Sequence, residues 1–238
     1  MSTLFKCPAF FIAGTDTGVG KTRVTGGLLK AARAIRAPVA GMKPVAAGSI
    51  LKDGRQISED ALYIEHNSGQ ISSYELLNPY CLPDPLSPHI AAKRAGIRID
   101  IDRIESAARQ LAQGQNLLLI EGAGGWYAPI SATETMADVA RALDVPVLLV
   151  VGLRIGCLNH ALLSVQAIER CGCRLRGWIG NLIDPEFAAR DENIAMLTQL
   201  LGTAPLALLP HAPDSSGDAL ALRAAAENLL AAQPGSAN

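Results

Sequence analysis

Short runs of residues that are apolar at every position recur along the chain, and each is followed by a glycine or polar residue. A run without alternation is typical of a strand buried on both faces, as in a parallel sheet. The runs lie at Ala9–Ala13, Val39–Met42, Leu117–Ile120, Val147–Val151, Trp178–Ile179 with its flanks, and Leu206–Leu209. The segments between them have helical patterns, at about residues 21–35, 58–67, 100–113, 135–143, 159–170, 186–201 and 217–232. This alternation predicts an α/β fold, with a mostly parallel sheet and helices on both of its faces.

The 238 residues suit a single domain spanning residues 1–238, and no repeat or linker divides them. Hydrophobic residues make up 49% of the chain and charged residues 18%, which favours a globular core over disorder. The formal net charge is −1, so charge gives no reason to expect binding to nucleic acid or to an anionic membrane. We also expect a cytoplasmic protein, because no apolar run is long enough to span a bilayer and none resembles a secretory signal.

The cysteines and prolines lead to structural predictions rather than functional ones. The five cysteines are scattered, apart from Cys171 and Cys173, and no histidine cluster accompanies them. A zinc site needs about four such ligands, so we interpret the cysteines as buried, reduced thiols. The proline-rich stretch at residues 79–88 is predicted to be a loop.

The segment Gly14–Thr22 has the composition of a phosphate-binding loop (P-loop), and it joins the first predicted strand to the first predicted helix. Backbone N–H groups of such a loop surround phosphate oxygens, and the helix N-terminus adds partial positive charge. Lys21 supplies a full charge for the β- and γ-phosphates, and the Thr22 hydroxyl is a ligand suited to Mg²⁺. Five residues separate Gly14 from Gly20, one more than in the general pattern. The alternative is a glycine- and threonine-rich turn between strand and helix, but Gly-Lys-Thr at the strand–helix junction favours a P-loop fold that binds a nucleotide with Mg²⁺.

An acidic residue, Glu121, ends the predicted strand at 117–120 and is followed by the glycine-rich run Gly122–Trp126. Ligands of parallel sheets bind at the carboxyl ends of the strands, so this position suits a Mg²⁺-binding carboxylate beside a P-loop. A strand-end glutamate that simply faces water is the alternative. The glycines would let the backbone approach a substrate closely.

Asp60 and Lys43 remain ambiguous on the residues alone. Asp60 begins a predicted helix, where acids also serve as caps. Lys43 follows the strand at 39–42 and precedes Pro44, which places it at the ligand-binding edge of the sheet. A solvated surface lysine is the alternative for Lys43.

Taken together, nine stretches resemble the dethiobiotin synthetase family, in order over most of the chain. They are Gly14–Thr22, Gly41–Ala46, Asp60–Leu62, Asn78–Tyr80, Ser87–Ile90, Glu121–Trp126, Val150–Gly152, Gly156–Ala161 and Gly177–Asn181. The Glu121–Trp126 and Gly156–Ala161 stretches are far more specific to that family than a P-loop alone, and the longer P-loop spacing is also the family's form.

The resemblance implies an ATP-dependent ring closure that belongs to biotin synthesis. The substrates would be 7,8-diaminononanoate, CO₂ and ATP. One amine would take up CO₂ as a carbamate, ATP would phosphorylate the carbamate, and the second amine would close the cyclic urea of dethiobiotin. The family also implies a homodimer.

The resemblance implies a role for each matching residue. The catalytic residues would be Lys43 and Lys21. The metal ligands would be Thr22, Asp60 and Glu121. The nucleotide would contact Gly18, Val19, Gly20, Lys21, Thr22, Arg23, Asp60, Glu121, Gly122, Ala123, Gly124, Asn181, Leu182, Pro210, His211 and Ala212. The diamine would contact Thr17, Lys43, Ala47, Gly156, Cys157 and Asn159, the last three at a helix start suited to its carboxylate.

Two positions depart from the family pattern, since Ala47 stands where the family often has serine and Gly18 where some members have glutamate. Either change weakens diamine binding or marks a different amine substrate. Two other functions fit a P-loop. One is the amidation domain of cobyrinic-acid-type synthetases, which needs a glutaminase for which this chain has no length. The other is a partner-binding ATPase of the plasmid-partition kind, which carries a lysine where this chain has Asp16.

Overall fold

A six-stranded sheet forms the centre of the molecule. The computed structural model describes residues 4–69, 73–212 and 214–234. The strands lie in the order β10-β9-β8-β1-β7-β2, and every neighbouring pair is parallel. Their bounds are β1 Ala9–Gly14, β2 Ala40–Met42, β7 Leu118–Glu121, β8 Val147–Leu153, β9 Leu175–Leu182 and β10 Ala207–Leu209. The predicted α/β fold with a parallel sheet is confirmed.

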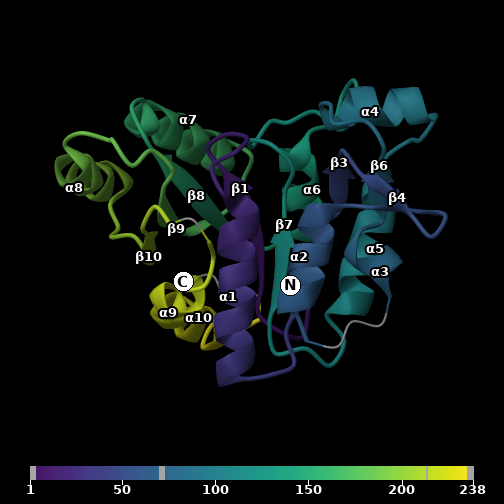
Figure 1. Cartoon of the computed structure of the whole chain (residues 1–238), viewed down its shortest axis with the longest axis horizontal. Coiled ribbons are helices and arrows are strands. Elements are labelled where there is room, and N and C mark those ends of the chain that lie inside the picture. The colour runs from purple at the N-terminus through teal and green to yellow at the C-terminus, as the bar shows by residue number, and fades with distance from the viewer. Residues whose placement is uncertain (1–3, 70–72, 213, 235–238) are drawn as a thin grey trace.

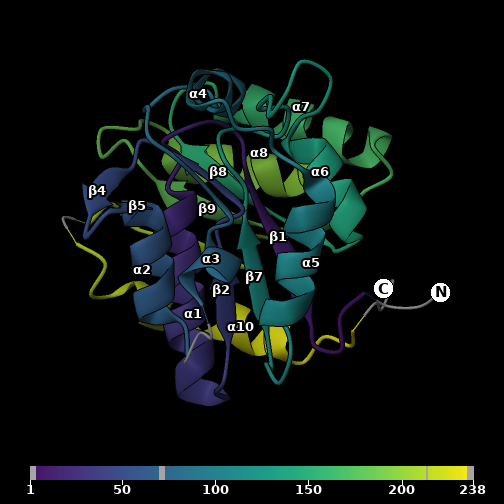
Figure 2. The ribbon, with the colours of Figure 1, turned by 90° about the vertical axis from the view of Figure 1, so that its right-hand side faces the viewer.

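Helices cover both faces of this sheet, and β1 shows why. Successive side chains of a strand point to opposite faces, so Phe10 and Ile12 lie in one hydrophobic core while Phe11 and Ala13 lie in the other. In Figure 2 the sheet stands between α1 and α2 on one side and α5 and α6 on the other. The helices of the first face are α1 Lys21–Ile35, α2 Glu59–Asn67 and α10 Arg223–Leu230. Those of the second face are α5 Ile101–Leu111, α6 Met136–Leu143, α7 Cys157–Arg170 and α8 Arg190–Leu201.

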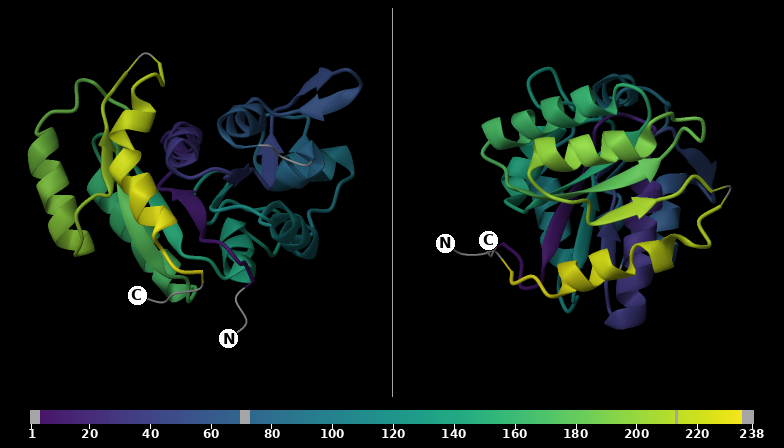
Figure 3. Two further views of the ribbon diagram at one scale, coloured as in Figure 1. Left: turned by 90° about the horizontal axis from the view of Figure 1, so that it is seen from below. Right: turned by 90° about the vertical axis from the view of Figure 1, so that its left-hand side faces the viewer.

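The predicted helices exist, with two differences near the C-terminus. The helix predicted at 186–201 begins only at Arg190, because Ala189 has a left-handed backbone with φ of 50°. The helix predicted at 217–232 is two helices, α9 Asp218–Ala221 and α10, separated at Leu222, where φ is −95° and ψ is 1°. Figure 3 shows these two helices in yellow, on the opposite side of the C-terminal strands from α7 and α8 in green.

The region between β2 and α5 holds short elements that we did not predict from the sequence. Two strands pair in parallel as β3 Val45–Ala47 and β6 Tyr80–Leu82. A projecting hairpin, blue in Figure 3, consists of β4 Ile50–Lys52 and β5 Arg55–Ile57. The helices here are α3 Tyr74–Leu77 and α4 Pro88–Ala95.

The prediction of a plain loop at residues 79–88 was therefore wrong. The stretch contains β6, which is only three residues long and takes its stability from pairing with β3 rather than from any local pattern. Its last proline, Pro88, is the first residue of α4, where the missing N–H is not needed.

The carboxyl ends of the parallel strands all open at one edge of the sheet, upper in Figure 1. Register places Met42 of β2 beside Ile120 of β7, so the next residues, Lys43 and Glu121, leave their strands side by side. The P-loop leaves β1 at the same edge. No helix in the described ranges is long and apolar enough to cross a membrane.

Candidate active site

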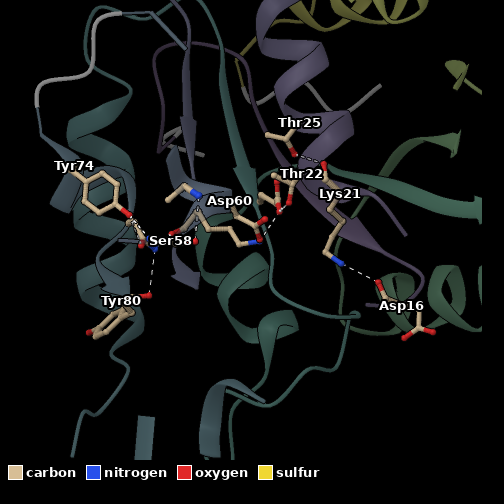
Figure 4. A network of polar contacts seen from close by, with 12 residues as sticks. Asp16, Lys21, Thr22, Thr25, Ser58, Asp60, Tyr74 and Tyr80 are labelled. Carbon is tan, nitrogen blue, oxygen red and sulfur yellow. Dashed lines mark hydrogen bonds and ion pairs between the residues drawn. The ribbon is translucent and has the colours of Figure 1, made fainter. Parts of the chain in front are cut away.

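The P-loop follows β1 and leads into α1, as the sequence predicts. Gly20 caps α1 with a φ of 88°, a conformation that L side chains rarely adopt. A Cβ atom at Gly20 would also lie 2.1 Å from Nδ2 of Asn181, so glycine is required there on two grounds. The Lys21 ammonium donates to the backbone carbonyl of Asp16 at 3.0 Å, and Figure 4 shows the side chain reaching along the loop.

A cluster of charged and polar side chains, centred on the buried Lys43 and Glu121, stands beside the P-loop. The Lys43 ammonium lies 2.6 Å from Oε1 of Glu121 and 2.9 Å from Oδ2 of Asp60. The Thr22 hydroxyl donates to the same Glu121 oxygen at 2.7 Å. We call these four residues, with Lys21, the charge cluster. It brings together the end of β2, the end of β7, and the starts of α1 and α2.

The structure decides whether Lys43 and Glu121 are surface groups and whether Asp60 is a helix cap. Lys43 is 4% exposed and Glu121 is fully buried, so neither is a solvated surface group. Asp60 is not the cap of α2, because Ser58 is the N-cap residue and its Oγ accepts from the Ala61 backbone N–H at 3.4 Å. The Asp60 carboxylate points to Lys43 instead.

Lys43 and Asp60 of the charge cluster stabilise each other in their ionised forms. Burial opposes the charge on Lys43, but the negative charges of Glu121 and Asp60 outweigh it and raise the pKa of Lys43. Burial likewise opposes the charge on Asp60, but the Lys43 charge and hydrogen bonds from Lys43 and Thr22 outweigh it, so the pKa of Asp60 is lowered. Burial, with the nearby positive charge of Lys43, lowers the pKa of Lys21 to about 8.

One oxygen of the cluster has no hydrogen-bond partner within the described chain. It is Oε2 of Glu121, which is buried. An unsatisfied buried carboxylate oxygen costs free energy unless a cation or donor meets it. With Asp60 and the Thr22 hydroxyl nearby, it fits Mg²⁺, which takes oxygen ligands and completes its shell with water and phosphate. Among the described residues, no three His, Cys, Asp or Glu side chains gather to form an all-protein metal cage.

Asn181 is held firmly at the end of β9. It is 2% exposed, and its Nδ2 donates to the Val19 carbonyl at 2.9 Å. Its Oδ1 accepts from Arg23 at 3.2 Å. Arg23 in turn makes two hydrogen bonds, of 2.7 and 2.6 Å, to the buried carboxylate of Asp218. Sequence reasoning missed Asp218, because nothing near it in the chain indicates a partner in α1.

Comparison with known proteins decides the family. A family model described as an AAA domain matches residues 8–219. A Xylella fastidiosa protein named ATP-dependent dethiobiotin synthetase BioD is 45% identical over 205 residues, which is 86% of this chain and 91% of that protein. A Xanthomonas oryzae protein of the same name is 44% identical over 214 residues, covering 90% of this chain and 96% of that protein. The chain belongs to the dethiobiotin synthetase family.

More distant solved structures share the fold of this dethiobiotin synthetase family member. The cell division protein MinD of Aquifex aeolicus is 15% identical, with a TM-score of 0.62 over 95% of this chain and 98% of that one. MinD of Pyrococcus horikoshii, solved with Mg-ADP, is 16% identical with a TM-score of 0.61 over 94% and 96% of the two chains. Identity this low shows a common P-loop fold and nothing finer.

The glycine run that resembles the dethiobiotin synthetase family lies against the P-loop. A Cβ atom at Gly124 would stand 3.6 Å from the Thr17 hydroxyl oxygen, and one at Gly125 would stand 3.9 Å from Cα of Asp16. Gly124 also has a φ of 65°. The structure thus brings the Gly124 and Gly125 backbone next to the loop that sequence reasoning assigned to phosphate, while Gly122 lies against Phe11 of β1.

The other predicted contacts of the dethiobiotin synthetase family lie nearer the surface. Gly156 caps α7 with a φ of 91°, Cys157 is buried behind it, and Asn159 is exposed. His211 is exposed, and Leu182 lines a cavity of about 320 Å³ at the end of β9. We call the segments Gly156–Asn159, at the start of α7, and Pro210–Ala212, after β10, the recognition surfaces.

The remaining predicted contacts, Thr17 and Ala47, do not join the charge cluster through a side-chain hydrogen bond. Thr17 is exposed on the P-loop, and its backbone N–H donates to the Asp16 carboxylate at 2.7 Å. Ala47 is half-buried at the end of β3 and has no hydroxyl to offer. Gly18 is exposed and open, with nothing near its missing side chain.

Proposed function

We propose that this protein is an ATP-dependent dethiobiotin synthetase, which closes the cyclic urea of dethiobiotin from 7,8-diaminononanoate and CO₂. The observation that carries the proposal is Lys43. It is a buried cation, held between two carboxylates directly beside a P-loop. Phosphoryl transfer needs such positioning and charge neutralisation more than it needs covalent help from the protein.

The reaction has three bond-forming steps. A neutral amine of the diamine attacks CO₂, forming a C–N bond and losing a proton to give a carbamate. A carbamate oxygen attacks the γ-phosphorus of ATP, and ADP leaves with the electrons of the broken P–O bond. The second amine attacks the carbonyl carbon of this mixed anhydride, phosphate leaves, and the proton of the amine is released. Phosphorylation is required because oxide is a poor leaving group and phosphate a good one.

Lys43 is suited to stabilise the carbamate and the transferring phosphoryl group. An ammonium group has three N–H donors, and two of them are directed to Glu121 and Asp60. The third remains for a substrate oxygen. The raised pKa of Lys43 keeps it charged at neutral pH. In a buried site, that charge acts more strongly than it would in water.

Lys21 and the P-loop backbone neutralise the β- and γ-phosphates. Thr22, Asp60 and Glu121 would hold Mg²⁺, which neutralises phosphate charge when bound. The buried, unpaired oxygen of Glu121 supports this assignment. Asn181 and Pro210–Ala212 would contact the adenine, with Arg23 holding the amide of Asn181 in place.

The diamine would bind across the edge of the sheet, between Thr17 and Ala47 at its amine end and Gly156–Asn159 at its carboxylate end. Two exposed apolar side chains flank that second region, since Ile155 is 79% exposed and Leu163 is 58% exposed. A second copy of the chain would cover such a surface, which supports a homodimer. We place the reaction in the cytoplasm, where ATP is available.

The test is a coupled measurement on purified protein with Mg²⁺, ATP and bicarbonate, with and without 7,8-diaminononanoate. We expect phosphate release to depend on the diamine and to match dethiobiotin, followed by mass, one for one. ATP binding without such coupling would contradict the proposal. In that case other diamines would be tried, because Ala47 and Gly18 are the positions at which this chain departs from the family pattern.

A further inference from the structure

The segment that contains α3 holds the backbone of Lys43 on both sides. The Lys43 N–H donates to the Leu77 carbonyl at 2.8 Å. The Lys43 carbonyl accepts from Nδ2 of Asn78 at 2.6 Å. Asn78 is 4% exposed, so this bond is shielded from water. The peptide groups on either side of the Lys43 Cα are therefore fixed by residues 34 and 35 positions further along the chain.

The Tyr74 hydroxyl joins this segment to the start of α2. It accepts from the Ser58 backbone N–H at 2.9 Å and donates to Oδ1 of Asn78 at 3.4 Å. Figure 4 shows the hydroxyl pointing toward Ser58, next to Asp60. Ser58 is the N-cap of the helix on which Asp60 stands. One hydroxyl thus connects the backbone of Asp60's helix to the amide that holds the backbone of Lys43.

This hydroxyl is a donor throughout the physiological pH range. Burial raises the pKa of Tyr74 to about 12, although the hydrogen bond from Ser58 acts in the opposite direction. Tyr74 therefore stays protonated, so its hydroxyl has a hydrogen to donate while its oxygen accepts from Ser58. Neither bond depends on a ligand.

We propose that Tyr74 and Asn78 are positioning residues, which set the separation between the Lys43 ammonium and the Asp60 carboxylate. In this proposal they act through the two backbones that they connect. The inference rests on the proposed function in one respect, that Lys43 is the catalytic cation. A small displacement of a charged group in an active site lowers the rate steeply, so the connection matters for turnover more than for binding.

Tyr80 provides a matched control, which distinguishes a positioning role of Tyr74 from a purely structural one. The Tyr80 hydroxyl accepts from a backbone N–H in the same way, from Asp100 at 2.9 Å, and it donates to the Asp100 carbonyl at 3.5 Å rather than to a residue that holds Lys43. Tyr74→Phe and Tyr80→Phe therefore each delete one hydroxyl that satisfies one backbone donor. Only Tyr74→Phe breaks the connection between Lys43 and Asp60.

The first experiment compares steady-state kinetics of Tyr74→Phe, Tyr80→Phe and the unchanged protein, with the melting temperature of each. We expect kcat to fall about tenfold in Tyr74→Phe with KM for ATP within twofold. Tyr80→Phe should lower the melting temperature by a similar amount and leave kcat unchanged. Equal kcat in Tyr74→Phe and Tyr80→Phe would overturn the proposal and leave Tyr74 a structural residue.

Asn78→Asp tests the other half of the connection. It keeps the shape of the side chain and removes both donors, so an oxygen faces the Lys43 carbonyl. We expect a larger fall in kcat than in Tyr74→Phe, if the variant folds. If it does not fold, Tyr74→Phe decides alone.

A second measurement does not depend on the reaction. Brief acetylation of the intact protein with acetic anhydride, read by peptide mass, reports the access and charge of each lysine. Lys43 should react slowly relative to the exposed Lys30, and its relative rate should rise about fivefold in Tyr74→Phe but not in Tyr80→Phe. No change in Lys43 reactivity in Tyr74→Phe would contradict the inference. If the unchanged protein makes no dethiobiotin, the proposed function fails, while this labelling still tests the positioning.

Discussion

The charge cluster and the recognition surfaces lie at the same edge of one sheet, yet they are built in opposite ways. In the cluster, Lys43 and Glu121 are almost completely buried, and the Lys43 ammonium pairs with Glu121 at 2.6 Å and with Asp60 at 2.9 Å. On the recognition surfaces, Asn159 and His211 are exposed. The groups that we propose to act on the phosphoryl group are thus fixed by contacts within the chain.

The difference follows from the electrostatics of burial. A charge is costly to bury and is retained only when its partners are fixed around it. The same burial makes that charge effective against a developing charge in the transition state. A carboxylate or an adenine edge needs only a few hydrogen bonds, which the ligand itself or a second copy of the chain can complete. Substitutions in the cluster should therefore lower kcat, and substitutions on the recognition surfaces should raise KM.

The largest effect is expected for Lys43→Ala. Removal of the cation that faces the reacting oxygens should lower kcat for dethiobiotin formation by about 10³-fold. ATP binding, measured by calorimetry, should persist in the folded variant. Lys30→Ala, a change of an exposed lysine on α1, is the control and should have no effect. Normal turnover in a folded Lys43→Ala protein would remove Lys43 from the mechanism.

Glu121→Gln comes next in size. The substitution keeps the shape of the side chain but removes the charge that faces Lys43 and the proposed Mg²⁺ site, so the Mg²⁺ concentration for half-maximal rate should rise about tenfold or more. A Mg²⁺ titration of the rate measures this. Glu105→Gln, on the surface of α5, is the control. An unchanged Mg²⁺ requirement would show that Glu121 is not a metal ligand.

A pH effect of about tenfold is expected for ATP affinity. Because the pKa of Lys21 is lowered to about 8 in the free protein, Lys21 is mostly charged at pH 7 and mostly neutral at pH 9. Phosphates favour the charged form, so binding at pH 9 must take up a proton and should be about tenfold weaker than at pH 7. Calorimetry in buffers of different ionisation enthalpy measures both the affinity and the proton. Lys21→Arg should bind without this pH dependence, and a flat profile for the unchanged protein would contradict the assignment.

The smallest effect is expected on the recognition surfaces. Asn159→Ala removes an exposed polar side chain at the start of α7, so KM for the diamine should rise about threefold to tenfold while kcat stays within twofold. Gln166→Ala, further along the exposed side of the same helix, is the control. A loss of kcat in Asn159→Ala would contradict the claim that the recognition surfaces affect KM and the charge cluster affects kcat.

The parts of the site that the sequence predicted are local in the chain. The P-loop is one continuous segment between a strand and a helix, and Glu121 follows directly from the end of an apolar run. The parts it missed depend on residues that are distant in the sequence. Arg23 and Asp218 are 195 positions apart, and the hydrogen bond from the Ser58 N–H to the Tyr74 hydroxyl joins α2 to α3. No periodicity or spacing reports such a pair.

The fold shows the same limit. The strands β1, β7 and β8 were predicted because each contains a continuous apolar run, whereas β3 and β6 are three residues each and exist through pairing with each other. The β4–β5 hairpin carried a local signal that was overlooked. Asp53 and Gly54 occupy its turn, with φ of 50° and 76°, and this dipeptide is typical of a two-residue hairpin turn.

The most direct test of carbamate phosphorylation measures the transfer of an oxygen atom from CO₂ to the released phosphate. The protein is supplied with ATP, the diamine and ¹⁸O-labelled CO₂, and the reaction is stopped before the label exchanges with water. If a carbamate oxygen attacks the γ-phosphorus beside Lys43, the released phosphate carries one ¹⁸O for each dethiobiotin formed. Unlabelled phosphate would mean that water attacks ATP, and the account of the charge cluster as the site of carbamate phosphorylation would be wrong.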